Sequence, residues 1–92
     1  SSAASAVYKR QVYAYYNRAN ILVSMKDYRG ALVDYNKAIE LDSRFSDAYY
    51  NRGLTNIFLG NNRQGIQDLS KAGELGIFAA YNVIKRFTTP AE

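Results

Sequence analysis

The sequence lacks both cysteine and histidine, and its one proline stands at position 90 of 92. Without cysteine there can be no disulfide, no thiolate metal site and no cysteine nucleophile, and without histidine there is no imidazole base or zinc ligand. No apolar run approaches the roughly 18 residues that a membrane-spanning helix needs. These absences predict no cofactor, no metal and no membrane span, and they make catalysis the least favoured class of function.

The lack of proline before Pro90 leaves the chain free to be helical, because proline is the strongest helix breaker. The length of 92 residues suffices for one domain with a single modest core. A hydrophobic share of 48% and a charged share of 22% are not those of a disordered segment. Residues 1–6 and 88–92 are exceptions, and we expect them to lie outside the folded part.

An internal repeat is the strongest signal in the sequence. An offset of 34 residues aligns the run Ala-Tyr-Tyr-Asn-Arg at residues 14–18 with the same run at residues 48–52. With six further matches, eleven of the 30 positions from 12 to 41 are identical, where background usage gives about two. The chain therefore holds two copies of one unit.

Apolar residues within each copy recur at helical spacing. Ala31, Leu32, Tyr35, Ala38 and Ile39 form a stripe on one helix face. Short polar segments at residues 26–28 and 60–62 separate one helix from the next. The pattern predicts that each unit is helix, turn, helix, and that the chain forms five helices at residues 6–26, 28–41, 46–59, 62–75 and 78–87.

Several residues are predicted to cap these helices. Asp27 and Asn61 can each accept a hydrogen bond from a free amide of the following helix, and Gln64 is placed to complete a capping box with Asn61. Ser46 is expected to cap the helix that opens the second copy. Gly76 is placed to end the fourth helix in a left-handed conformation.

Small residues recur at three points of the unit where paired helices would approach closely: Ala19 and Gly53, Ala31 and Gly65, and Ala38 and Ala72. Leucine at Gly53 or Ala38 should damage the fold, since overpacking typically costs about 1 to 3 kcal/mol. A 34-residue helix-turn-helix unit with this alternation of small and large residues, ending Asn-Lys-Ala-Ile-Glu-Leu-Asp at residues 36–42, resembles the tetratricopeptide repeat. The resemblance covers residues 12–79.

The resemblance implies an all-α fold, a right-handed superhelical stack of helix-turn-helix pairs forming one domain over residues 1–92. The two repeats would span about 12–45 and 46–79, followed by a capping helix at 78–87. The family recognises peptide or protein partners in a concave groove lined by the first helix of each pair. We therefore expect a non-enzymatic interaction scaffold whose partner-binding residues are Tyr13, Tyr16, Asn17, Asn20, Ser24, Asp47, Tyr50, Asn51, Leu54, Phe58, Asn82, Lys85 and Arg86.

The predicted groove is rich in asparagine and tyrosine. Asparagine amides donate to and accept from a peptide backbone, and tyrosine rings give rigid apolar area with a polar tip. Replacing Asn17 and Asn51 by alanine should weaken partner binding and leave the helix content intact. A packing role stays equally open for Tyr16, Tyr50, Asn17 and Asn51.

The sequence departs from the family pattern at several positions. Arg18 and Arg52 stand where leucine is common. Asn56 replaces a usually bulky residue, which predicts that this stretch of the third helix is less deeply buried. By contrast, Tyr15 and Tyr49 match positions that the family packs, and we expect them in the core.

One subtype of the family holds the carboxylates at a partner's carboxyl terminus with lysines, asparagines and an arginine from three repeats. Asn20 and Asn51 match two of those clamp positions, but Tyr16 stands in place of the first lysine. The third repeat, which supplies the other cations, is here reduced to a capping helix. We therefore do not expect that clamp.

Self-association is an alternative function. The first helix is predicted to extend almost three turns ahead of the first repeat and to offer Val7, Tyr8 and Val12 as apolar surface. That surface would allow pairing with another copy of the chain to give a homo-oligomer, docking on an upstream repeat in a longer parent protein, or a local fold-back.

RNA binding is a weaker alternative, since the net charge is +4 and Lys9, Arg10 and Arg18 lie near one end. Tyr13 and Tyr16 would then stack on unpaired bases. Acidic residues are interspersed, however, so no continuous basic stripe emerges.

Catalysis is disfavoured by the placement of the carboxylates. No two of them are directed by the repeat geometry into one closed pocket. Asp34 and Asp68 occupy equivalent positions of the two units and are expected to be exposed.

Overall fold

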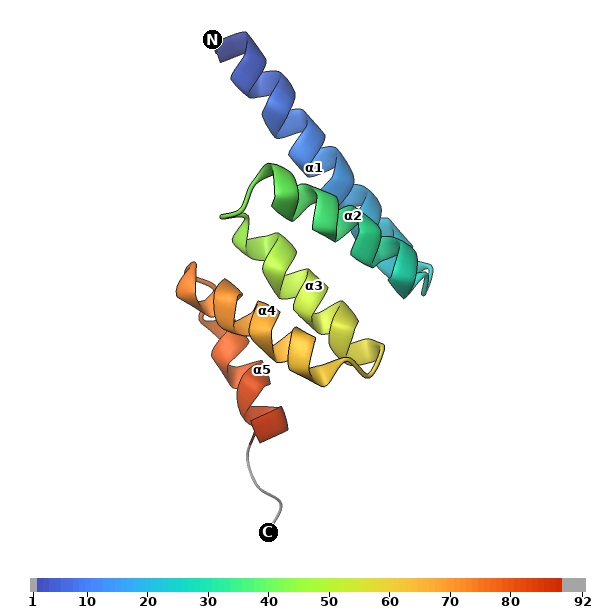
Figure 1. Ribbon diagram of the computed structural model, residues 1–92, viewed down its shortest axis with the longest axis vertical. Helices are drawn as coiled ribbons and strands as arrows, with labels where there is room; N and C mark the ends of the chain where they lie inside the picture. The colour runs from blue at the N-terminus through green and yellow to red at the C-terminus, as the bar shows by residue number, and fades with distance from the viewer. Residues whose placement is uncertain (1, 89–92) are drawn as a thin grey trace.

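Five helices follow one another in the computed structural model, which describes residues 2–88 (Figure 1). They are α1 (Ser2–Ser24), α2 (Tyr28–Leu41), α3 (Ser46–Phe58), α4 (Asn62–Glu74) and α5 (Ala79–Thr88), with no strand within the described range. Helix α1 begins four residues before the predicted start, and α5 ends one residue after its predicted end, so the expectation that residues 2–6 and 88 lie outside the folded part was wrong. Residues 1 and 89–92, which were also expected outside it, are not among the described residues.

The helices are arranged as a stack of pairs. Helix α1 packs on α2 and α3 packs on α4, while α2 joins the pairs by contacting α3, and α5 packs on α4. The stack measures 56 × 28 × 16 Å, with α1 at one end and α5 at the other (Figure 1). The first turns of α1 project beyond α2 (Figure 1). No helix among the described residues combines the length and the apolar character needed to cross a membrane.

The core consists of three small clusters between successive helices, built largely from alanine. The fully or nearly fully buried residues of these clusters are Val12, Ala38, Phe45 and Ala48, then Ala19, Ala31 and Tyr35, and finally Leu69, Ala72 and Ala80. The side chains of Tyr15 and Tyr49 pack against the first and third clusters and stay half-buried. Small residues at the helix crossings let the backbones approach, as the sequence predicted.

The backbones of α3 and α4 approach each other closely where the two helices cross. A Cβ atom added at Gly53 would lie 2.9 Å from the carbonyl oxygen of Gly65 and 3.0 Å from Cγ of Leu69. A Cβ atom at Gly65 would lie 2.8 Å from the Gly53 carbonyl oxygen. The two distances to carbonyl oxygens are shorter than real Cβ contacts allow, so this crossing needs both glycines.

The capping helix α5 is seated by a third glycine. Tyr81 lies over Gly73, where an added Cβ would be 2.6 Å from the tyrosine ring. The first repeat has Ile39 at the equivalent position. The second unit thus departs from the first at the point where α5 docks.

Three helices end in the same turn, which places one residue in the left-handed region. After α4, Gly76 has φ of 111°, its N–H donates to the Gly73 carbonyl, and the Ile77 N–H donates to the Ala72 carbonyl. This is the Schellman arrangement, and it confirms the role predicted for Gly76. Gly60 after α3, with φ of 84°, and Lys26 after α1, with φ of 63°, occupy the same position in their turns.

The predictions for the helix starts were partly wrong. Asp27 caps α2 as expected, because its carboxylate accepts from the Gly30 N–H at 3.0 Å. Asn61 makes no side-chain cap bond, and its own N–H is engaged by the Asn56 carbonyl in the preceding turn, so it is not free for a capping box with Gln64. Ser46 is the first residue of α3, and the buried Phe45 before it takes the cap position without a side-chain bond.

Candidate functional site

A shallow hollow lies between α1 and α3 on the face predicted to bind a partner. It encloses about 150 Å³ and is lined by Asn20, Val23, Tyr35, Asn51, Leu54, Thr55 and Phe58. Four of these residues come from α3, two from α1, and Tyr35 reaches in from α2. We call this region the α1–α3 groove. Among the predicted residues, it brings together Asn20, Asn51, Leu54 and Phe58.

A polar cluster forms the centre of the groove. The Asn51 amide nitrogen donates to the Tyr16 hydroxyl oxygen and to the Asn20 carbonyl oxygen, both at 3.0 Å. The Tyr35 hydroxyl also donates to the Asn20 carbonyl oxygen. Burial, followed by the proximity of Tyr16, raises the pKa of Tyr35 to about 12, so it stays protonated and able to donate at neutral pH. We call Tyr16, Asn20, Tyr35 and Asn51 the amide cluster.

Aromatic side chains stand at both ends of the amide cluster. Tyr13 is 54% exposed and meets Phe45 edge to face at 5.3 Å between ring centroids. Phe58 is 67% exposed and stacks on Tyr28 with centroids 5.5 Å apart. Both rings are held by a neighbour and still present a face to solvent. They can therefore add apolar contact area at little cost in side-chain entropy.

The other predicted residues of α1 and α3 differ in how exposed they are and in whether their polar groups already bond within the chain. Asn17 is exposed, and so is Asp47 in the first turn of α3. The Ser24 hydroxyl donates at 2.6 Å to a carbonyl one turn earlier in α1, which occupies its proton locally. Tyr50 is half-buried and packs against the core cluster around Leu69.

The predicted residues of α5 are not part of the groove. Asn82, Lys85 and Arg86 are exposed on α5, which packs on α4, and none of them lines the α1–α3 hollow. These three positions had been assigned by matching α5 to the first helix of a full repeat, and α5 has only part of that repeat's pattern. The structure therefore places them as a separate surface.

Sequence reasoning missed two polar contributors to the groove. Tyr35 was interpreted as a packing residue of α2, yet its hydroxyl end supports Asn20. Thr55 is 1% exposed, and its hydroxyl donates to the Asn51 carbonyl of the preceding turn at 2.7 Å. A hydroxyl within an otherwise apolar stripe was the available signal for both.

A repeated ion pair corrects the view that Asp34 and Asp68 are exposed. Asp34 is 3% and Asp68 is 7% exposed. Arg18 binds Asp34 through Nε and Nη2 at 2.6 and 2.8 Å, and Arg52 binds Asp68 in the same way at 2.9 and 2.7 Å. The hydrogen bonds to Asp34 raise the pKa of Arg18. Arginine in place of leucine at these two positions is thus explained by a bidentate partner 16 residues later.

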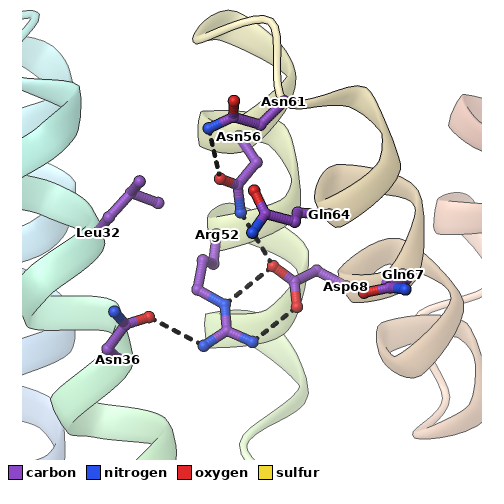
Figure 2. Close-up of a pocket in the computed structure, with 8 residues that line it drawn as sticks. All are labelled: Leu32, Asn36, Arg52, Asn56, Asn61, Gln64, Gln67 and Asp68. Atoms are coloured by element: carbon purple, nitrogen blue, oxygen red, sulfur yellow. Dashed lines mark hydrogen bonds and ion pairs between the residues drawn. The ribbon is translucent and has the colours of Figure 1, made fainter.

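The second ion pair lies in a polar hollow of about 340 Å³ between α2, α3 and α4 (Figure 2). Arg52 also donates through Nη1 to Asn36 of α2 at 3.0 Å, and Asn56 donates to Asp68 at 3.3 Å. Asn56 is only 6% exposed, which contradicts the prediction that its stretch of α3 is less deeply buried. Its amide is tolerated there because Asp68 and Asn61 both bond to it.

The structure also changes which residues are available for the two alternative functions, self-association and RNA binding. Val12 is 4% exposed and belongs to the core, whereas Val7 and Tyr8 are 47% and 45% exposed. Arg18, invoked for RNA binding, is engaged by Asp34. Among residues 2–88, no group of three or more acidic side chains is placed to hold a metal ion.

Comparison with known proteins places the chain. The tetratricopeptide repeat family matches residues 12–45, and a second model of that family matches residues 34–67. A serine/threonine-protein phosphatase T from Aspergillus oryzae is 34% identical over 65 residues, which are 71% of this chain and 14% of the phosphatase.

A solved structure shows the same fold. The first repeat domain of Spaghetti (RPAP3), bound to the HSP90 peptide SRMEEVD, superposes with a TM-score of 0.79 at 25% identity. The match covers 84% of this chain and 63% of that one. With two matching repeat models that together span residues 12–67, and this shared fold, the chain belongs to the tetratricopeptide repeat family.

Proposed function

We propose that the chain is a non-enzymatic interaction scaffold that binds an extended peptide segment of a partner protein in the α1–α3 groove. The amide cluster carries this proposal. Inside the cluster, Asn51 uses its amide nitrogen and Asn20 uses its carbonyl oxygen. The Asn20 nitrogen and the Asn51 oxygen remain for a ligand, and they match the acceptor and the donor of a peptide backbone.

The apolar parts of the groove suit a side chain of the same peptide. The hollow of about 150 Å³ lies directly beside Asn20 and Asn51 and is bounded by Leu54 and Phe58. When a peptide binds in an extended form, backbone hydrogen bonds supply affinity and pockets for alternate side chains supply specificity. We therefore propose that one apolar side chain of the ligand enters this hollow while its backbone bonds to the amide cluster.

The charge of the groove favours a neutral ligand. Asp47 is the one charged residue at the predicted positions of α1 and α3, and no cation stands among them. The Spaghetti domain binds a peptide, SRMEEVD, with three acidic residues. Tyr16 takes the place of a clamp lysine, so we propose an apolar, uncharged segment as the ligand class here.

A selection followed by a titration tests the proposal. A peptide array probed with the purified chain provides a ligand, and its affinity is measured by calorimetry. Asn51→Ala and Phe58→Ala should each weaken binding about tenfold or more, equivalent to about 1.4 kcal/mol. Phe78→Ala is the matched control, because Phe78 is 73% exposed and does not line the hollow. Unchanged affinity in both groove variants would place the ligand elsewhere.

Two asparagine variants separate binding from packing. Asn17 is exposed, so Asn17→Ala should leave the thermal melting curve unchanged. Asn51→Ala removes bonds to Tyr16 and Asn20 and should lower stability by about 0.5 to 1.5 kcal/mol. A collapse of folding in Asn51→Ala would assign that residue a structural role and remove the best support for the groove.

A pair of named peptides tests the charge preference. SRMEEVD is compared with an analogue in which glutamine and asparagine replace its acidic residues and an amide replaces its terminal carboxylate. In high salt, which screens the net charge of +4, the acidic peptide should show no advantage. A strong preference for SRMEEVD under those conditions would indicate a carboxylate clamp.

A further inference from the structure

One face of α1 is the repeat equivalent of a buried face of α3. Shifted by 34 residues, Ile21 corresponds to Thr55 and Arg18 to Arg52. Thr55 is 1% exposed, and the Arg52 side chain is 22% exposed, because the first repeat covers them. Ile21 is 58% exposed, and the Arg18 side chain is 65% exposed. The same stacking surface is thus covered on α3 and uncovered on α1.

The hydrogen bonds of Arg52 and Arg18 show what the first repeat contributes where it covers α3. Arg52 donates through Nη1 to Asn36, which comes from the preceding helix pair (Figure 2). Arg18 bonds to Asp34 through Nε and Nη2 alone within the described part of the chain. The preceding helix pair thus supplies Arg52 with an amide oxygen, and no described residue supplies Arg18 with the equivalent bond or buries Ile21.

The uncovered face of α1 forms a regular stripe. Its members follow steps of four and three residues, five of them on α1 and the last in the turn directly after it, and all are exposed: Val7, Gln11, Ala14, Arg18, Ile21 and Met25. Such spacing is the pattern of a helix seam that packs against another helix. A hollow lined by Gln11, Ala14, Tyr15 and Arg18 lies on this face. We call these six residues the α1 stripe.

The α1 stripe is complementary to itself. Its midpoint is residue 16, so an antiparallel copy places Val7 against Met25, Gln11 against Ile21, and Ala14 against Arg18. The small Ala14 leaves room for the long Arg18 side chain, and the Gln11 amide next to it can accept from Arg18. Because Asp34 neutralises Arg18, bringing two such pairs together adds no net charge to the interface.

We propose that two copies of this chain form a two-fold dimer through the antiparallel α1 stripes. In this dimer the Gln11 side-chain oxygen of one copy accepts a hydrogen bond from Arg18 of the other, as the Asn36 oxygen accepts one from Arg52. The groove residues Tyr16, Asn20 and Ser24 lie on a different face of α1, so the dimer leaves both α1–α3 grooves open to ligands.

Charge favours this arrangement over head-to-tail stacking. If α5 of one copy packed antiparallel on α1 of the next, Arg86 near the end of α5 would lie toward the end of α1 that carries Lys9 and Arg10. The antiparallel pairing instead puts Lys9 and Arg10 beside the segment around Leu22 and Val23, which is uncharged. A two-fold interface also closes on itself, whereas a head-to-tail contact continues into a filament.

Sedimentation equilibrium over a range of concentrations measures the assembly. The wild-type chain should approach twice 10.4 kDa as the concentration rises. Ile21→Glu should raise the dissociation constant about a hundredfold or more, since it places a carboxylate in the seam. Val33→Glu is the matched control, because Val33 is 67% exposed on α2 and lies outside the stripe. A wild-type chain that stays monomeric, or a dimer indifferent to Ile21→Glu, would overturn the proposal.

Cysteine cross-linking tests the antiparallel register, because the chain has no cysteine of its own. The double variant Val7→Cys/Met25→Cys should form covalent dimers under mild oxidation. The two positions are about 27 Å apart along α1, so they cannot bridge within one copy. Met25→Cys alone should not cross-link, and cross-linking of that single variant would indicate a parallel pair instead. Circular dichroism confirms that each variant keeps its helices.

Discussion

The α1–α2 and α3–α4 pairs share the same repeat unit and the same internal ion pair, but they differ in what surrounds them. The second pair crosses at Gly53 and Gly65, where the first crosses at Ala19 and Ala31. Arg52 of the second pair is enclosed by the neighbouring repeat, whereas the equivalent arginine of the first is largely exposed. The repeated sequence therefore determines which side chains form the ion pair. The position of the repeat in the stack determines how exposed that ion pair is, and so how much we expect it to contribute to stability.

The largest effect is expected at the glycine crossing. Gly53→Leu should destabilise the chain by about 3 kcal/mol, at the upper end of the overpacking range, because its side chain would meet the Gly65 carbonyl and Leu69. At the equivalent position of the first repeat, Ala19→Gly introduces the residue that the second repeat has there and should cost only about 1 kcal/mol through helix propensity. Urea denaturation of the two variants measures the difference. A wild-type midpoint for Gly53→Leu would show that the crossing can relax.

The two ion pairs should respond unequally to removal of the carboxylate. Asp68→Ala leaves the partly buried Arg52 without its main partner and should cost about 2 to 3 kcal/mol. Asp34→Ala should cost less, because water can solvate the exposed Arg18. Denaturant midpoints of both variants test the order. Equal losses would mean that the surrounding repeat adds nothing to the Arg52 pair.

Alkaline pH should weaken the first repeat selectively. Tyr35, whose equivalent in the second repeat is Leu69, has a pKa of about 12 in the folded chain and 10.0 as an ordinary phenol. Well below pH 10 the phenol is neutral in both states, so its contribution to stability is complete. Between pH 10 and about 12 the unfolded state ionises first, and that contribution is lost. In Tyr35→Phe, denaturation curves should depend less on pH over this interval, and an identical dependence would point to the other tyrosines.

The smallest effect is expected at the turns after α1 and α3. Lys26 has a left-handed backbone conformation, and the equivalent residue of the second repeat, which has the same conformation, is Gly60. Lys26→Gly should stabilise the chain by about 0.5 kcal/mol, and the reciprocal Gly60→Lys should destabilise it by about 1 kcal/mol. Thermal melts resolve the two signs. A loss of stability in Lys26→Gly would show that flexibility gained in the unfolded chain outweighs the relieved strain.

The elements predicted best from the sequence are those governed by local rules. The bounds of α2, the Asp27 cap and the Gly76 turn each depend on residues within one or two helical turns of one another. The exposure of Asp34 and Asp68 was mispredicted because an isolated carboxylate on a helix is usually solvated. Their arginine partners lie 16 residues away, and the clue was that arginine and aspartate recur together in both copies.

The sequence predicted the groove residues on α1 and α3, but not the residues that hold them in place. Its asparagines and aromatic ends follow from the repeat register on α1 and α3. The hydroxyl of Tyr35 enters from α2, and a pattern read along one helix cannot show which end of a side chain reaches a neighbouring helix. The burial of Asn56 was missed for a related reason, since Asp68 on another helix makes that burial possible.

The order of the helices along the stack has a kinetic consequence. The main contacts join helices that follow one another in the chain, so few loops must close over long sequence separations before packing begins. Chains with such local contacts commonly fold in microseconds to milliseconds. Amide protons should then exchange in a gradient, slowest in the middle of the stack, where α3 packs on both α2 and α4, and fastest toward the first turns of α1, since the terminal helices can open without unfolding the middle of the stack.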